Sequence, residues 1–166
     1  MQIVVKNKDT LLLDEFKFKC SLGKKGTTFN KMEGDLKTPK GTYSIGSLFY
    51  RKDKIVRFST KLKKIPIKKN MYWCNDINSK YYNKLITSPK KGKHEKMFRN
   101  DSKYDLIIII NYNTKKIIKN KGSAIFLHLT SDYKKTEGCV AIKKIHLLKI
   151  IKELKNNTKI KIEDQK

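Results

Sequence analysis

The sequence predicts a mainly β fold with one clear helix in its C-terminal region. Residues 104–112 contain four consecutive isoleucines, and a β-branched run that is apolar on both faces is typical of a central strand. Residues 142–154 instead carry an apolar residue at every third position, which indicates an amphipathic helix. We therefore expect a sandwich-like arrangement of mixed sheets against which this helix packs.

The length and composition fit one globular domain. The chain has 166 residues, 38% of them hydrophobic, and we expect residues 1–166 to form a single domain. The formal net charge is +25, from 40 Lys and Arg against 15 Asp and Glu. Two explanations stay open: a lysine-rich surface without a partner, or attraction to an anionic polymer such as nucleic acid, cell wall or membrane. The even spread of the lysines favours the first.

The first half of the chain predicts short strands separated by loops. Alternating apolar and polar residues or aromatic runs mark the strands, and Gly, Pro, Asn and Asp mark the turns. On these signals we expect strands at 3–6, 11–20, 42–45 and 71–74, strand pieces near 27–30, turns at 7–9 and 38–41, and a loop at 75–92.

The second half contains the central strand and the helix. We expect a short helical turn at 95–98, strands at 104–112 and 124–129, the helix at 142–154, and a closing edge strand at 158–162 in which lysines alternate with isoleucines. Within 124–129, the period of two places the even-numbered residues, His128 among them, on one face and the odd-numbered residues on the other.

The cysteines argue against a metal site. Cys20, Cys74 and Cys139 form no CxxC pair, so we expect neither zinc nor a dense disulfide framework, although a Cys20–Cys74 disulfide stays open. The N-terminus has no signal-peptide pattern, and no run is long enough to span a membrane. From the sequence alone we expect a soluble chain that is not visibly exported.

The strongest candidate chemistry lies between residues 122 and 154. His128 ends an apolar run and Cys139 follows eleven residues later, so a loop can return the thiol to the imidazole, which would act as its general base. Gly138 allows a sharp turn and close substrate approach. The N–H groups near Gly138 and Cys139 are candidates for an oxyanion hole.

Other polar and aromatic residues are weaker candidates for the site. The hydroxyls of Thr136 and Ser131 would hold the histidine tautomer or bind a substrate peptide group, or else serve the turn. Trp73, Tyr81 and Tyr82 would wall a groove or lie in the core. The simpler interpretation of His94 is a solvent-exposed position, and that of His146 is a structural role in the helix.

Five blocks of the sequence resemble one known family. They are GDLKTPKGTYSIG at 34–46, MYWCNDINSKYYN at 71–83, HEKMFRNDSKYDLIIIINYN at 94–113, GSAIFLHL at 122–129 and TEGCVAI at 136–142. Their order and spacing, over about residues 21–154, resemble the L,D-transpeptidase catalytic domain family (YkuD-like). The family motif is a histidine followed downstream by Ser/Thr-x-Gly-Cys.

The resemblance implies a β-rich fold with the cysteine at the mouth of a cleft. It also implies a reaction on peptidoglycan stem peptides, in which a thiolate attacks the amide between a diamino acid and the following D-alanine. D-Alanine leaves, and the thioester is resolved by an amine of a second stem, giving a 3–3 cross-link, or by water. By position, Cys139 is the nucleophile, His128 the base, Gly138 the turn residue and Thr136 the motif hydroxyl. No metal or organic cofactor is implied.

The chain departs from the family pattern at two positions. Many members have arginine two residues after the cysteine, where this chain has Ala141, and Lys143 or Lys144 is the expected substitute. Many also have glycine after the histidine, where this chain has Leu129. The resemblance implies the cell envelope or periplasm, whereas the missing signal peptide leaves a cytoplasmic location open.

Two other functions remain as alternatives. A non-catalytic basic module would bind an anionic polymer, cell wall or nucleic acid, although no nucleic-acid-binding motif is present and no specific nucleic acid is expected. Another cysteine–histidine hydrolase is disfavoured, because papain-like enzymes usually place the cysteine before the histidine.

Overall fold

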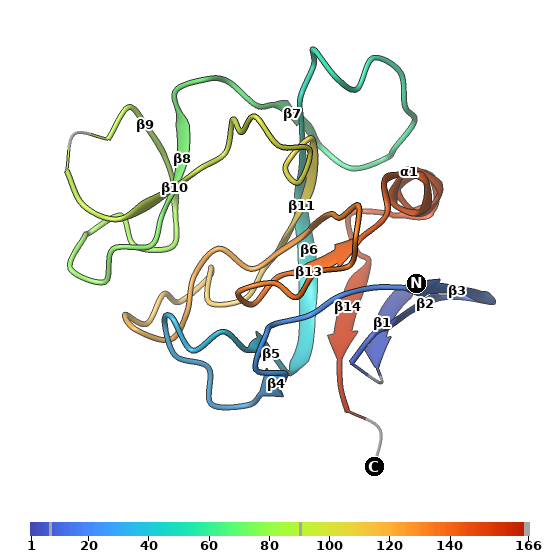
Figure 1. Ribbon diagram of the computed structural model, residues 1–166, viewed down its shortest axis with the longest axis horizontal. Helices are drawn as coiled ribbons and strands as arrows, with labels where there is room; N and C mark the ends of the chain where they lie inside the picture. The colour runs from blue at the N-terminus through green and yellow to red at the C-terminus, as the bar shows by residue number, and fades with distance from the viewer. Residues whose placement is uncertain (7, 90, 165–166) are drawn as a thin grey trace.

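The computed structural model describes residues 1–6, 8–89 and 91–164 (Figure 1). Residue 7 of the predicted turn, residue 90 of the predicted loop and residues 165–166 lie outside this range. The elements are β1 (Gln2–Lys6), β2 (Thr10–Leu13), β3 (Phe16–Lys19), β4 (Thr27–Thr28), β5 (Thr38–Pro39), β6 (Gly41–Tyr50), β7 (Lys64–Pro66), β8 (Met71–Cys74), β9 (Leu85–Thr87), β10 (His94–Lys96), β11 (Leu106–Ile110), β12 (Phe126–Leu129), β13 (Val140–Ile142), α1 (Lys144–Glu153) and β14 (Lys159–Ile162).

Nine of these strands form one mixed sheet, which confirms the mainly β prediction. Its order is β13-β12-β11-β6-β14-β1-β2-β3, with β7 added beside β6. The two ends of the sheet meet, because Ser21, just after β3, exchanges backbone hydrogen bonds of 2.8 and 2.9 Å with Ala141 of β13. The sheet is therefore nearly closed on itself.

The central strands are buried on both faces, as the isoleucine run predicted. In β11, Leu106, Ile108 and Ile110 join a core inside the curved sheet, whereas Ile107 and Ile109 join a second core on the opposite face. β12 continues this division: its odd-numbered residues lie in the first core and Phe126 in the second. The predicted alternation over 124–129 is thus confirmed.

A smaller sheet covers the second core. It has the order β10-β8-β9, and Figure 1 shows it on the side of the large sheet opposite to α1. Trp73 of β8 and Met97, just after β10, pack in the second core with Phe126 of β12. This contact brings the segment around β10 close to the end of β12, where His128 lies.

The helix starts later than predicted. Residues 140–142 form β13, which runs parallel to β12 with His128 opposite Ala141, so their burial comes from the sheet and not from a helix. The buried residues of α1 are Leu147, Ile150 and Ile151, whereas Ile145 of the predicted stripe is 72% exposed. The true apolar face follows the i, i+3, i+4 spacing of a helix that packs on a sheet.

Several predicted boundaries in the N-terminal half were wrong. The single strand expected at 11–20 is a hairpin of β2 and β3, because Asp14 adopts a left-handed conformation (φ 49°) that reverses the chain. The turn expected at 38–41 contains β5, which pairs with β4, and the start of β6. The long-range pairing partners of these short segments decide their structure.

Three predictions in the C-terminal half also fail. The helical turn expected at 95–98 is strand β10 with its exit, because His94 and Lys96 pair with β8. The loop expected at 75–92 includes β9. Strand β14 is not at an edge: it lies between β6 and β1, and its lysines point outward from a central position.

Two further findings concern the cysteines and membranes. Cys20, Cys74 and Cys139 are all free and buried, so the Cys20–Cys74 disulfide is absent. Within the part of the chain that the structure describes, no helix has the length and apolar character needed to cross a membrane.

Candidate active site

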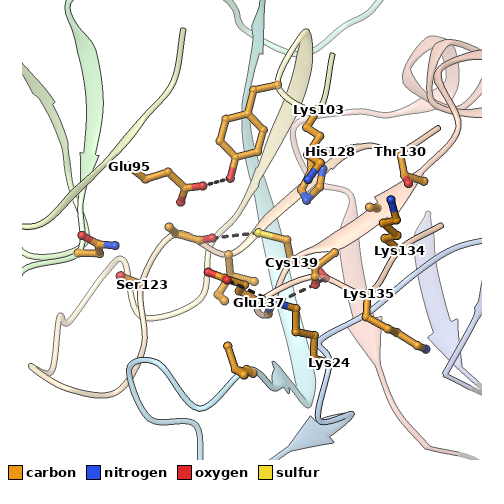
Figure 2. Close-up of a pocket in the computed structure, with 18 of the residues that line it drawn as sticks. Lys24, Glu95, Lys103, Ser123, His128, Thr130, Lys134, Lys135, Glu137 and Cys139 are labelled. Atoms are coloured by element: carbon orange, nitrogen blue, oxygen red, sulfur yellow. Dashed lines mark hydrogen bonds and ion pairs between the residues drawn. The ribbon is translucent and has the colours of Figure 1, made fainter. Parts of the chain in front are cut away.

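Cys139 and His128 line the same pocket, which has a volume of about 340 Å³ (Figure 2). His128 comes from β12, and Cys139 directly precedes β13, the parallel neighbour of β12. Since successive side chains of a strand alternate between faces, the pairing of His128 with Ala141 also places Cys139 on the His128 face. The sheet thus brings together two residues that the sequence separates by a loop.

His128 is held as a neutral imidazole. Its Nδ1 lies 2.9 Å from the carbonyl oxygen of Leu129, so Nδ1 carries the proton and Nε2 keeps a lone pair. Burial lowers the pKa of His128 to about 4, and the nearby charges of Lys103 and Arg99 act in the same direction. A neutral imidazole with a free Nε2 is the form that can accept a proton from a thiol.

Cys139 is held as a neutral thiol. Its Sγ donates to the carbonyl oxygen of Ala124 at 3.1 Å and accepts from the N–H of Phe126 at 3.4 Å. Burial raises the pKa of Cys139, and the negative charge of Glu95 raises it further. Among the described residues the thiol makes no hydrogen bond to His128, so proton transfer requires Sγ to turn from Ala124 toward Nε2.

The segment from Thr136 to Cys139 is a turn locked by one hydroxyl. Thr136 Oγ1 donates to the Cys139 carbonyl at 2.6 Å and accepts from the Gly138 N–H at 3.2 Å. Gly138 has φ 149°, and a side chain there would lie 3.0 Å from the Lys37 carbonyl oxygen. The hydroxyl therefore serves the turn that presents Cys139, and an oxyanion would compete with it for the Gly138 N–H.

The other candidate side chains of the sequence analysis lie outside the pocket lining. Ser131 is exposed on the loop after β12. Trp73 is buried in the second core, where its indole N–H donates to Asn83 Oδ1 at 2.9 Å. The same Asn83 oxygen accepts from the Ala124 N–H at 3.1 Å. Trp73 thus supports, through Asn83, the residue whose carbonyl holds the thiol.

The remaining aromatic and histidine candidates are also accounted for. Tyr81 is 49% exposed, whereas Tyr82 is buried with its hydroxyl donating to Glu33 at 2.5 Å. His94 lies in strand β10, opposite Cys74 of β8, instead of in a charged loop. His146 packs on Phe18 with 5.1 Å between ring centroids. None of these side chains contributes to the lining of the pocket.

Two residues that sequence reasoning missed complete the pocket. Glu95 of β10 accepts a hydrogen bond from the Tyr104 hydroxyl, and the Tyr104 ring packs on His128. Both residues line the pocket with Cys139. The sequence signal for Glu95 was hidden, because we expected 95–98 to be a helical turn within a charged loop.

The pocket has two differently charged sides. In Figure 2, Glu95 and Ser123 lie on one side of Cys139, and Lys103, Lys134 and Lys135 lie on the other.

Ala141, at the position where the family commonly has arginine, is buried in β13. Lys143 and Lys144, the expected substitutes, are exposed at the start of α1 and do not line the pocket. The cations on the basic side of the pocket are instead Lys103, Lys134 and Lys135, which lie in other loops.

No metal centre is formed by the described residues. Across 1–6, 8–89 and 91–164, no three His, Cys, Asp or Glu side chains converge as metal ligands would. The chemistry that the pocket offers comes from a thiol, an imidazole, carboxylates and several ammonium groups.

These features define a class: a mainly β protein with a nearly closed mixed sheet and a cysteine–histidine pair in one pocket. The family model of the L,D-transpeptidase catalytic domain (YkuD) matches residues 1–162. The chain therefore belongs to the L,D-transpeptidase catalytic domain family, which confirms the resemblance seen in the sequence. No curated protein matches the chain in sequence.

Two solved structures share the fold at low sequence identity. The helical cell shape determining protein Pgp2 from Campylobacter jejuni has a TM-score of 0.50 and 16% identity, over 99% of this chain and 48% of that one. Bdellovibrio bacteriovorus Bd1075 also has a TM-score of 0.50 and 16% identity, over 97% of this chain and 46% of that one. The chain thus spans about half the length of these relatives.

Proposed function

We propose that this protein is a cysteine-dependent L,D-transpeptidase that acts on peptidoglycan stem peptides. The observation that carries the proposal is that the Cys139 thiol, just before β13, and the Nε2 edge of His128, on the neighbouring strand β12, line one pocket. The family to which the chain belongs supports the same reaction. The similarity to a cell shape determining protein supports a substrate in the cell wall.

The proposed reaction begins when Sγ rotates from the Ala124 carbonyl toward His128. Nε2 takes the thiol proton, and the thiolate attacks the carbonyl carbon of the amide between the diamino acid and D-alanine. The tetrahedral intermediate then collapses, and the leaving amine of D-alanine takes the proton from Nε2. The product is a thioester on Cys139 and free D-alanine.

The second half of the reaction resolves the thioester. An amine of a second stem attacks the thioester carbonyl and gives its proton to His128, which returns it to the departing sulfur. The result is a 3–3 cross-link, whereas attack by water gives a shortened stem and carboxypeptidase activity. Because both nucleophiles use the same base, the proposed site allows both outcomes.

The basic side of the pocket fits the carboxylates of a stem peptide. Lys103, Lys134 and Lys135 lie on this side. Their ammonium groups would bind the substrate carboxylate in place of the arginine for which this chain has Ala141. A peptidoglycan substrate places the proposed reaction in the cell envelope.

The experiment that tests the proposal is incubation with a tetrapeptide stem, followed by mass spectrometry. We expect D-alanine release and an acyl adduct on Cys139 that is absent from Cys139→Ala. His128→Gln should form the adduct at least about 100-fold more slowly, because general-base catalysis contributes about that much. A folded protein with an intact Cys139 that gives neither adduct nor D-alanine would contradict the proposal.

A non-catalytic basic module is the second candidate function, favoured by the net charge of +25. It would bind an anionic polymer with strong dependence on salt, because each neutralised anionic group releases counterions. Binding to wall polymer that survives Cys139→Ala, without any turnover of the stem, would favour this candidate.

A further inference from the structure

Glu95 is a carboxylate placed beside the candidate nucleophile. Its side chain comes from β10, in the small sheet, and points into the pocket on the side of Cys139 away from the lysines (Figure 2). One of its oxygens, Oε1, accepts from the Tyr104 hydroxyl. No described residue donates a hydrogen bond to the other oxygen, Oε2, so this oxygen is open to the pocket.

The negative charge of Glu95 is not neutralised by an ion pair within residues 1–6, 8–89 and 91–164. Arg99, whose charge acts on Glu95, binds the Asp101 carboxylate with both Nε (3.0 Å) and a terminal nitrogen (2.6 Å). Burial raises the pKa of Glu95, and Glu137 and Glu33 act in the same direction, whereas the Tyr104 hydroxyl and Arg99 lower it. A half-buried carboxylate without a counterion has lost part of its hydration, and a bound cation would offset that loss.

The same charge acts on the thiol. Glu95 is the charge that most raises the pKa of Cys139; Glu137 acts in the same direction, and Lys31 lowers this pKa. Lys31 is itself bound to Asp35 at 2.5 Å, and Glu137 is exposed near Lys24. Glu95, which is half-buried, is therefore the group whose neutralisation would most favour the thiolate.

We propose that Glu95 is a specificity-determining residue, which selects an acyl donor carrying a free ammonium group near the scissile amide and holds Cys139 as a thiol until that group is bound. The inference rests on the proposed function, whose diamino acid substrate supplies such an ammonium group. On binding, the ammonium pairs with the free Oε2 of Glu95, and the negative charge that opposes the thiolate is offset. Donor binding and nucleophile activation are thereby coupled through one side chain.

The first test uses alkylation of the free protein by iodoacetamide, a neutral reagent that reports the thiolate fraction of Cys139. Glu95→Gln keeps an acceptor for the Tyr104 hydroxyl but removes the charge. We expect Cys139 in this variant to react about tenfold faster at pH 8, as a pKa lowered by about one unit requires. Peptide mapping separates Cys139 from Cys20 and Cys74.

Glu33→Gln is the matched control for that test. Glu33 also lines the pocket, but its Oε2 already accepts hydrogen bonds from Tyr82 at 2.5 Å and Ser123 at 2.8 Å, so two donors offset its charge. We expect its alkylation rate to stay within about twofold of wild type. Equal rates in the Glu95→Gln and Glu33→Gln variants would overturn the proposal.

The second test compares two tetrapeptide donors, one with a free side-chain amine on the third residue and one in which that amine is acetylated. The wild type should prefer the free amine by about tenfold in kcat/KM, and Glu95→Gln should lose this preference. An unchanged preference in Glu95→Gln would overturn the proposal while leaving the transpeptidase function intact. If neither donor reacts, the proposed function fails, and the alkylation rates still decide whether Glu95 restrains the thiol.

Discussion

The ring of Tyr104 packs edge-on against the imidazole of His128, with 5.3 Å between centroids and 71° between ring planes. The Tyr104 hydroxyl is fixed at its other end by Glu95. The imidazole is therefore held by a ring on its side and by the Leu129 carbonyl at Nδ1. An aromatic pair of this geometry adds about 0.5–1.5 kcal/mol beyond the area that it buries.

Substitution of Tyr104 should separate the ring contact from the hydrogen bond. Tyr104→Phe keeps the packing on His128 but leaves Glu95 without its donor, and should reduce the free energy of unfolding by about 2 kcal/mol. Tyr104→Ala also opens a cavity and should cost about 4 kcal/mol. Urea unfolding measures both values. Equal costs for the two variants would show that the ring does not hold the imidazole.

The buried His128 should make stability depend on pH. Its pKa is about 4 in the folded protein, against about 6.5 in an unfolded chain. Between these values the unfolded state binds a proton that the native state does not, so stability falls as the pH is lowered from about 6.5 to 4. The loss from this group is about 3 kcal/mol.

Urea unfolding between pH 4 and 8 checks this dependence, with His128→Gln as the comparison. The variant cannot titrate at this position, so its stability should change less over the same window. Parallel pH profiles for the two proteins would contradict the neutral, buried state of His128.

Thr136 should stabilise the turn before Cys139 through its hydroxyl. Thr136→Val keeps the shape of the side chain but removes the hydrogen bonds to the Cys139 carbonyl and the Gly138 N–H. We expect a loss of about 2 kcal/mol in the free energy of unfolding, together with slower acylation. Thr136→Ser restores the hydroxyl and should recover most of both. A serine variant as impaired as the valine variant would argue against this role.

Gly138 should tolerate no side chain. Its backbone is in a region favoured by glycine (φ 149°), and an added Cβ would meet the Lys37 carbonyl oxygen at 3.0 Å. Gly138→Ala should therefore lower the free energy of unfolding by about 3 kcal/mol. Gly34 has φ 74° with nothing within 4 Å of an added Cβ, so Gly34→Ala should cost only about 1 kcal/mol. Chemical denaturation of the two variants compares them directly, and similar costs would exclude a role for the close contact.

The fold class was predictable because its strongest signals are local. The isoleucine run of β11 and the alternation in β12 each require burial on two faces, whatever the neighbouring strands are. The failures concern segments whose structure depends on distant partners. Ile142 fits the first apolar position of the predicted helix, but it pairs with β12 as part of β13. Residues 158–162 fit an edge strand, but β14 lies between β1 and β6.

The candidate site was predictable where the chain itself carries the motif. Cys139, Gly138 and Thr136 lie in one turn, and His128 precedes them by a short loop. Glu95 was out of reach, because only the contact between the small sheet and the second core brings it to the pocket. The carbonyl of Ala124, which holds the thiol, carries no side-chain signal at all.

The central position of β14 imposes an order on biosynthesis. β1 and β6 share β14 as their common neighbour, yet β14 follows every other described strand along the chain. While residues 159–162 are still within the ribosome, β1 and β6 each present an unpaired edge, the kind of surface that promotes wrong pairings. The large sheet can therefore be completed only after residues 159–162 have been synthesised, and a nascent chain interrupted before β14 would be a natural client for chaperones and proteases.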